Sequence, residues 1–378
     1  MRESKAMQVE TAVSRQADIL KAVAEIKHQL ASHSELVLFF ASSSYASNEL
    51  AQAMARAFPE SQVVGCTTSG EIAQGEMLHN SVVAMGFPKE MVGPVAVAVV
   101  ENLDRLQSSQ VALALAELAE PFEIEAAAAS PHQFAGLVLT DGLSRREEKL
   151  MEHLGDLSDV LFVGGSAGDD LHFKKTHVFA DGKAYTNSAV LILMKPRCRF
   201  GVIKSQSFLA TGKVLVATRV DEENRIVHEF DHRPAAQAYA EALGRPVEEL
   251  SDAFMTHPLG LMSGAEPFVR SPMKVENDAV HFYCMIRQGM PLEILQSTDI
   301  VEDTRSSLQR KQEELGPLQA VINFHCILRT LELQKQGREK DYAELFNPWK
   351  NIGLSTYGEA YLGHINQTST MLVLGDPS

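Results

Sequence analysis

A short motif that occurs near each end of the chain constrains its fold most strongly. The first copy is Gly65-Cys66-Thr67-Thr68-Ser69-Gly70-Glu71, and the second is Gly353-Leu354-Ser355-Thr356-Tyr357-Gly358-Glu359. Each copy has two glycines five residues apart, hydroxyl side chains between them, and a glutamate directly after the second glycine. A β-rich run follows each copy and is opened by an asparagine, Asn80 or Asn366. This pattern predicts a strand, a tight glycine turn and a returning strand, used more than once.

A looser third copy, Gly164-Gly165-Ser166-Ala167-Gly168-Asp169, lies between the other two. Its returning strand is predicted at residues 187–193, after a hairpin signal at Asp181-Gly182 that should pair residues 173–179 with 184–194. The copies lie much further apart than the roughly 50 residues of a solenoid repeat. They therefore indicate duplicated sheet units.

Three apolar runs, at residues 36–40, 134–139 and 189–194, read as buried strands without polar alternation. Both faces of their sheets should therefore be covered. We expect a mixed α/β (α+β) fold, with two related halves of mixed sheets covered by helices. The expected division is an N-terminal helix within residues 1–34, a first domain at 35–195 and a second domain at 196–378.

Residues 14–31 read as an amphipathic helix, because Ile19, Val23, Ile26 and Leu30 form one apolar stripe. Ser14 is the expected N-cap. The stripe either packs on the domain behind it or serves as a short dimerising helix, so a homodimer stays open.

The charge balance and the absence of targeting signals bear on partners and location. The net charge is −15 over 378 residues, which repels phosphate, so we expect neither a nucleic-acid nor a membrane partner. No apolar run approaches the ~20 residues needed to span a bilayer, and the N-terminus lacks the apolar region of a secretory signal. Four scattered cysteines form no CxxC motif. We therefore expect a cytoplasmic protein with free thiols.

Taken in order, several segments resemble the FIST family, bacterial sensory modules with an N-terminal and a C-terminal FIST part. The resemblance covers about residues 35 to 375, and its segments are residues 63–72, 163–169, 268–272, 326–329, and 356–359 with 366–368. It implies a ligand-sensing role in signal transduction, with small molecules such as amino acids as ligands.

The resemblance also implies a cofactor and partners for one branch of the family. Stand-alone FIST proteins of the NosP type are haem-binding nitric-oxide sensors that act on histidine kinases or cyclic-di-GMP enzymes. No kinase, cyclase or methyl-accepting segment follows in this sequence, so we expect a signalling partner in trans. Haem needs an axial His, Cys, Met or Tyr, and His325 and His257 are the candidates. A histidine on a strand can equally be exposed or hydrogen-bonded in the core.

The glycine motifs and two arginines supply the candidate ligand site. Backbone N–H groups beside glycine can form an anion-binding nest, although the same turns can be purely structural. Arg270 and Arg329 lie among apolar residues and either bind a ligand carboxylate or form an internal ion pair, with Glu359 or Asp299 as partner. Glu71 and Glu359 either bind a ligand amine or accept backbone hydrogen bonds. The predicted ligand-binding set is Thr67, Gly70, Glu71, Arg270, Cys326, Arg329, Tyr357, Gly358, Glu359 and Asn366.

No catalytic motif stands in the context that its chemistry needs. The sequence has no P-loop or Rossmann fingerprint. The pattern GxSxG occurs at Gly164–Gly168, inside the third glycine motif, and HExxH occurs at His228–His232, in a stretch that reads as strand and loop, whereas a zinc site of this type needs a helix. We therefore predict a sensor that is not an enzyme and that binds a small ligand. A metabolite sensor without haem, an enzyme with an unrecognised site and an interaction scaffold remain as alternatives.

Overall fold

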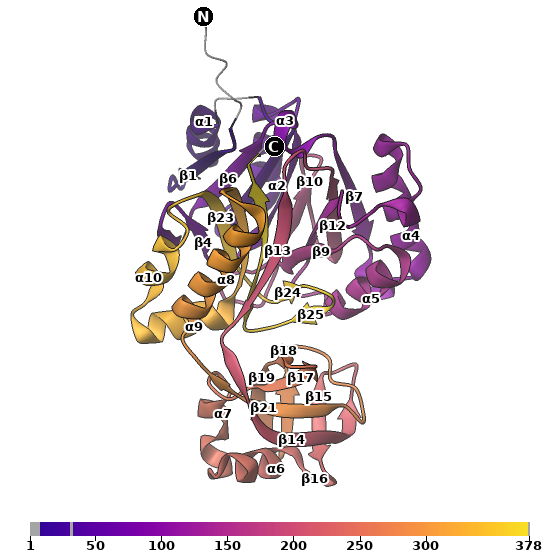
Figure 1. Cartoon of the computed structure of the whole chain (residues 1–378), viewed down its shortest axis with the longest axis vertical. Coiled ribbons are helices and arrows are strands. Elements are labelled where there is room, and N and C mark those ends of the chain that lie inside the picture. Colours follow the sequence, from indigo (N-terminus) through magenta and orange to yellow (C-terminus); the bar gives the residue numbers. More distant parts are fainter. Residues whose placement is uncertain (1–7, 31–32, 377–378) are drawn as a thin grey trace, which may run out of the picture.

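A computed structural model describes residues 8–30 and 33–376 (Figure 1). Within these residues, three six-stranded mixed sheets form a body, and an eight-stranded antiparallel sheet forms a separate small domain inserted into it. The mixed α/β class predicted from the sequence is confirmed, and the internal repetition extends to three units.

The body is one unit used three times: strand, helix, strand, helix, strand, short hairpin and returning strand. The first unit comprises β1 (Glu10–Ser14), α1 (Ile19–Gln29), β2 (Leu36–Ser42), α2 (Ser47–Ala57), β3 (Gln62–Thr68), β4 (Glu71–Ala73), β5 (Glu76–Leu78) and β6 (Val82–Phe87). After α3 (Lys89–Val92), the second unit comprises β7 (Val95–Glu101), α4 (Ser108–Ala119), β8 (Ala135–Thr140), α5 (Glu147–Leu157), β9 (Phe162–Ser166), β10 (Val178–Ala180), β11 (Lys183–Tyr185) and β12 (Ser188–Met194). The third comprises β13 (Phe200–Gln206), α8 (Ile300–Leu315), β22 (Leu318–Cys326), α9 (Ile327–Gln336), α10 (Glu339–Glu344), β23 (Lys350–Thr356), β24 (Glu359–Ala360), β25 (His364–Ile365) and β26 (Thr368–Gly375).

The inserted domain lies between β13 and α8, and Figure 1 shows it below the body. Its strand order is β18-β17-β21-β14-β15-β20-β19, and β16 pairs with β15. Its elements are β14 (Phe208–Asp221), β15 (Ile226–Phe230), β16 (Arg233–Pro234), α6 (Ala235–Leu243), α7 (Leu250–Ala253), β17 (Leu259–Ser263), β18 (Glu266–Arg270), β19 (Pro272–Glu276), β20 (Ala279–Phe282) and β21 (Pro291–Ser297).

Each unit completes a sheet of its neighbour with its short hairpin. The hairpin β4–β5 of the first unit pairs with β23 of the third, and β10–β11 of the second unit pairs with β3 of the first. The cycle closes where β24–β25 of the third unit pairs with β9 of the second. No unit can therefore complete its own sheet alone, so the three should fold as one body.

Strands β2, β8 and β12 are buried on both faces, as predicted for the three apolar runs, and β22 is almost entirely buried as well. Because successive side chains alternate between faces, Leu38 and Phe40 of β2 join Leu137 of β8 and Phe324 of β22 in one core between the three sheets. Phe39, on the opposite face, packs in a separate core beneath α1 and α2. Helices α4 and α5, and helices α8, α9 and α10, cover the other two sheets in the same way.

The three glycine motifs converge at one junction, where backbone hydrogen bonds link them in a cycle. Ser69 N donates to Ser355 O at 3.0 Å, Gly168 N donates to Thr67 O at 3.0 Å, and Tyr357 N donates to Ser166 O at 3.3 Å. A Cβ atom at Gly168 would lie 2.4 Å from Ser69 Oγ and 2.8 Å from Ser69 N. Glycine is required there because two turns of different units approach each other closely.

Three local expectations need correction or refinement. The helix predicted at residues 14–31 is shorter, because Asp18 caps it by accepting from Lys21 N, while Ser14 ends strand β1. In the third unit the left-handed residue before the returning strand is Gln367 (φ 50°), equivalent to Asn80 (φ 53°), so Asn366 is not the counterpart of Asn80. The turn at Asp181 and Gly182 does form a hairpin, but β11 is short and β12 joins another sheet.

Candidate functional site

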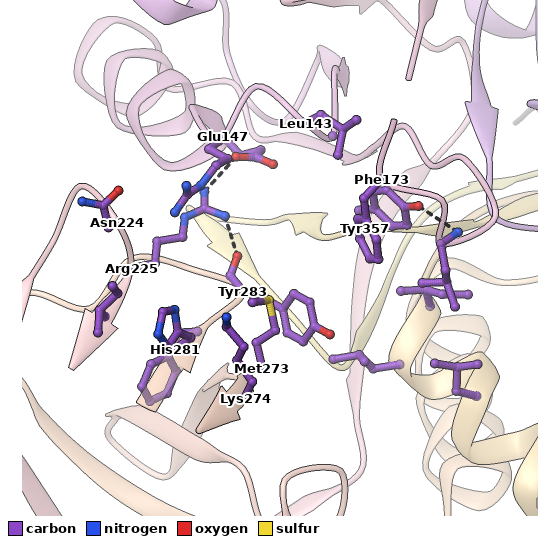
Figure 2. A pocket seen from close by; sticks show the side chains of 18 residues that line it. Leu143, Glu147, Phe173, Asn224, Arg225, Met273, Lys274, His281, Tyr283 and Tyr357 are labelled. Carbon is purple, nitrogen blue, oxygen red and sulfur yellow. Dashed lines mark hydrogen bonds and ion pairs between the residues drawn. The ribbon is translucent and has the colours of Figure 1, made fainter. Parts of the chain in front are cut away.

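A cavity of about 620 Å³ lies where the inserted domain faces the body (Figure 2). The body contributes Leu143, Phe173, Ile327, Leu331 and Tyr357 to its wall. The inserted domain contributes Arg225, Ile226, Met273, His281 and Tyr283. Both volume and apolar lining suit a small organic ligand.

The body wall is formed where parallel strands end. β8 and β9 are parallel neighbours, as are β22 and β23, and the segments that follow all four strands reach the cavity. Leu143 follows β8, Phe173 follows β9, Ile327 begins α9 after β22, and Tyr357 follows β23. The carboxyl ends of parallel strands are a general location for ligand sites in α/β proteins.

An aromatic pair forms one side of the cavity. The rings of Phe173 and Tyr357 are stacked with centroids 5.0 Å apart, and Phe173 is half exposed. The Tyr357 hydroxyl donates to the Asp169 carboxylate and accepts from Leu171 N at 2.9 Å. Asp169 also accepts from the backbone N–H groups of Phe173 and of the two lysines after it, at 2.7–2.9 Å. The carboxylate thus fixes the loop that carries Phe173.

The pKa values of this pair follow from the same contacts. Burial alone would raise the pKa of Asp169, but the hydrogen bonds from Tyr357 and from the loop backbone lower it below its usual value. Burial and the hydrogen bond to Asp169 raise the pKa of Tyr357. Asp169 therefore stays an ionised acceptor and Tyr357 stays a neutral donor near neutral pH.

A buried ion pair bridges the body and the inserted domain at the cavity. Arg225, on the turn before β15, donates to Glu147 Oε2 at 3.0 Å and to Glu148 Oε2 at 2.7 Å, and both glutamates open helix α5 of the body. It also donates to Tyr283 O at 2.6 Å, within its own domain. Glu148 accepts a further hydrogen bond from Met285 N at 2.7 Å. Figure 2 shows Arg225 between Glu147 and Tyr283.

Three further basic residues line the cavity: Arg145, Lys274 and His281. Lys274 Nζ lies 2.9 Å from Glu276 Oε2, and His281 Nε2 lies 3.3 Å from the same oxygen. Burial and the charge of Lys274 lower the pKa of His281, so its imidazole is neutral near pH 7. Arg145 has a left-handed backbone (φ 55°), which a non-glycine residue seldom adopts.

Comparison with known families identifies the family to which this chain belongs. Residues 35–233 match the FIST N domain, and residues 235–361 match the FIST C domain. The chain belongs to the FIST family. FIST domains are sensory and are associated with signal transduction. The two matches of this FIST protein meet at residues 233–235, inside the inserted domain.

Two individual proteins show weaker similarity to this FIST protein. An uncharacterized protein of Methanocaldococcus jannaschii is 22% identical over 288 residues, which are 70% of this chain and 54% of the relative. The chain thus spans about half the length of the curated relative that it matches. A solved structure titled "Cyanuric acid hydrolase: evolutionary innovation by structural concatenation" aligns with a TM-score of 0.29 and 10% identity, over 77% of this chain and 99% of that chain. None of the helices in the described residues has the length and apolarity that crossing a bilayer requires.

Of the ten ligand-binding residues predicted from the sequence, Tyr357 lines the cavity. Glu71 and Glu359 occupy equivalent positions behind the turns and are fully buried. Glu71 accepts from Thr68 Oγ1 and from Ser81 N, whereas Glu359 accepts from the backbone N (3.0 Å) and Oγ1 (2.6 Å) of Thr368. Each glutamate thereby fastens a turn to its returning strand.

The other residues predicted in the glycine motifs also lie within the body. The Thr67 hydroxyl accepts from His177 N at 3.0 Å, and Gly70 has a φ of 124° that favours glycine. A Cβ atom at Gly358 would lie 2.0 Å from the His364 ring. Asn366 is fully buried, and its amide has no hydrogen-bond partner among the described residues.

The two predicted arginines do not form the ion pairs considered from the sequence. Arg270 donates to His364 O at 3.0 Å, and Arg329 donates to Thr304 Oγ1 at 2.9 Å and to Ser205 O. Asp299 is paired with Arg338 instead, at 2.6 Å. Cys326 is fully buried close to Glu359, and burial raises the pKa of its thiol. Within the described residues both arginines therefore donate to neutral oxygens, while the Nε of each is buried without a hydrogen-bond partner.

The two histidines predicted as haem ligands lie away from the cavity lining. His325 is fully buried with its ring 4.3 Å from that of Tyr342, and burial lowers its pKa. His257 Nδ1 lies 2.9 Å from Thr256 Oγ1. Within the described residues, no group of three or more His, Cys, Asp or Glu side chains is placed to hold a metal ion.

The sequence pattern did not point to Arg225, Glu147, Phe173 or His281. The run Arg145-Arg146-Glu147-Glu148 reads as the solvated start of a charged helix, whereas Glu147 is buried against Arg225. Nothing in the sequence separates His281 from the other histidines, 13 in all. One sequence feature could have pointed to the ion pair: two acidic residues, Glu147 and Glu148, stand together at the start of a helix. Acidic residues are common at this position, however, because they interact favourably with the helix dipole.

The two equivalent glutamates predict a pH dependence of stability. Burial raises the pKa of Glu359 from 4.5 to about 8 and that of Glu71 from 4.5 to about 7. A raised folded-state pKa means that the folded protein holds the proton more tightly than the unfolded chain does. The free energy of unfolding should therefore fall as pH rises from about 4.5 to 8. The free energy of unfolding, measured by urea titration across this pH range, should change less with pH for Glu359→Gln than for the wild type. The same pH dependence in both proteins would contradict a raised pKa for Glu359.

Proposed function

We propose that the protein is a cytoplasmic sensor that binds a small ligand in the cavity between body and inserted domain. Occupancy changes how the inserted domain sits on the body, and a separate signalling protein, such as a histidine kinase or a cyclic-di-GMP enzyme, reads the change. The observation that carries the proposal is a cavity walled by residues of both parts, such as Tyr357 and Ile226.

The contacts around the cavity support coupling between ligand and domain position. Arg225 connects the two parts through Glu147 and Glu148, and Arg225 itself lines the cavity. At the periphery Arg287 pairs with Glu152 at 3.1 Å. A ligand that prefers one arrangement of these contacts shifts the population toward it.

We propose haem as the alternative occupant of the same cavity. His257 and His325 do not line it, but His281, Met273, Tyr283 and Tyr357 do, and their side chains are of the types that ligate haem iron. Haem held by such a residue would supply the iron that binds nitric oxide. A fresh preparation with a Soret band that shifts with nitric oxide would favour this occupant; a colourless protein that does not take up haemin would remove it.

A pair of substitutions that narrows the cavity from both walls tests the proposal. Ile226→Trp lies on the inserted domain and Leu331→Trp lies on the body, and both side chains are half-buried. A small-molecule extract of the native host should raise the unfolding temperature of the wild type. A ligand that binds only the folded state stabilises that state by about 2.7 kcal/mol when the free ligand concentration is 100 times Kd. The double variant should show no such shift.

Leu113→Trp is the matched control, since Leu113 is exposed on α4 outside the cavity. This control should respond to the extract as the wild type does. An equal shift in all three proteins, or in none, would contradict the proposed site.

A further inference from the structure

We infer that the cavity recognises a flat apolar acid, whose carboxylate binds the guanidinium of Arg145 while its apolar body lies against Phe173. This inference rests on the proposed function and adds the chemical class of the ligand. Three observations carry it: the apolar wall of the cavity, the ion pairs already formed by most of the charged lining residues, and Arg145, which forms no ion pair within the part of the chain that the structure describes.

The wall facing the ligand is largely apolar. Leu143, Ile226, Ile327 and Leu331 contribute aliphatic surface from both parts. Phe173 adds an aromatic face that is 51% exposed although its ring stacks on Tyr357. An exposed ring held in place by its neighbours is a suitable surface for stacking a flat ligand, because little ordering is then required on binding.

Most charges that line the cavity are already compensated. Arg225 has two carboxylates, those of Glu147 and Glu148, and Lys274 has Glu276. A cationic ligand would therefore meet carboxylates that are already paired. An apolar cation is for this reason a poorer match than an apolar anion.

Arg145 differs from the other lining cations, because its guanidinium forms no ion pair with any described residue. Hydrogen bonds from Asn224, and also the charge of Arg145, lower the pKa of Asp221. The Asp221 carboxylate nevertheless accepts from Asn224 N at 3.1 Å and Asn224 Nδ2 at 2.9 Å, and forms no ion pair with Arg145. The left-handed backbone at Arg145 (φ 55°) is a costly conformation of the kind that concentrates at functional sites. A planar guanidinium with free donors matches the two oxygens of a carboxylate.

Three probes of similar size and different charge test the inference: 2-naphthoate, 2-naphthamide and 2-naphthylmethylammonium. Calorimetric titration of the full chain should show that naphthoate binds ~10-fold or more tightly than the amide, because only the carboxylate forms charge-assisted hydrogen bonds with the guanidinium. The ammonium probe should bind most weakly.

Arg145→Gln should remove the preference for naphthoate and leave binding of the amide unchanged. Phe173→Ala should weaken both probes by roughly the same factor, since both lose the stacking surface. Arg105→Gln is the matched control, because Arg105 is exposed on the body and does not line the cavity. Both arginines are exposed, so neither change should affect folding.

Equal affinity for naphthoate and naphthamide, or a preference that survives Arg145→Gln, would overturn the inference. Such a result, together with an extract-dependent shift that the Ile226→Trp/Leu331→Trp variant lacks, would reject the ligand class and leave the proposed function standing. Naphthoate binding that is unaffected by the double variant would place the acid site elsewhere and reject the inference as well.

Discussion

Arg225→Ala is expected to lower the free energy of unfolding by about 3–5 kcal/mol, the usual cost of breaking a buried ion pair. The side chains of Arg225 and Glu147 are 9% and 6% exposed, and Glu148 is also largely buried. Removing the guanidinium leaves two carboxylates without a cation in a poorly solvated place. Because the pair joins the inserted domain to the body, urea unfolding should also lose its single transition, with the inserted domain unfolding first.

Two comparisons separate this interpretation from a general loss of packing. Arg219→Ala removes a matched ion pair with Glu229 on the same domain, where the side chains are 60% and 30% exposed, and should cost about 0–1 kcal/mol. Adding Glu147→Gln and Glu148→Gln to Arg225→Ala should recover part of the loss, because no unpaired carboxylate then remains. A similar loss for Arg219→Ala and Arg225→Ala, without recovery in the triple variant, would contradict this account of the bridge.

Gly168→Ala is expected to lower the free energy of unfolding by about 1–3 kcal/mol, the range for overpacking a close contact. The added methyl group would lie 2.8 Å from Ser69 N and 3.0 Å from Thr68 C, both backbone atoms of another unit. The junction of the three turns would have to open to admit it. Thermal unfolding measured by circular dichroism gives the change in stability.

Gly155→Ala provides the control for this substitution. Gly155 lies in helix α5, where an added methyl group meets no atom within 4 Å. Alanine should stabilise that helix by up to about 1 kcal/mol. If Gly168→Ala were as stable as Gly155→Ala, the close approach of the turns would be wrong.

The sequence predicted the parts of the fold that depend on local pattern. The apolar runs around Phe39, Val138 and Leu191 correctly indicated strands covered on both faces, because sheets buried on two sides need no polar alternation. The glycine motifs indicated repetition because each turn needs the same backbone geometry. Resemblance of ordered segments indicated the FIST family, which the family match confirms.

Local sequence pattern could not predict the pairing of each hairpin with a neighbouring unit, or the position of the cavity. Whether β4 pairs within its own unit or with β23 depends on how three units close around a common core, and neighbouring residues do not encode that choice. Phe173, Arg225 and Tyr357 meet at the cavity from three distant segments. The prediction of Tyr357 came from the motif that it shares with the structural turns, not from any sign of a cavity.

Native mass spectrometry tests the central claim, that a small ligand occupies the cavity between body and inserted domain, most directly. Wild type, Leu113→Trp and Ile226→Trp/Leu331→Trp would be incubated with small-molecule extract of the native host, and their masses would be compared. We predict the same bound mass, at one ligand per chain, on the wild type and Leu113→Trp, and no bound mass on the double variant. The same bound mass on all three proteins, or on none, would contradict the account.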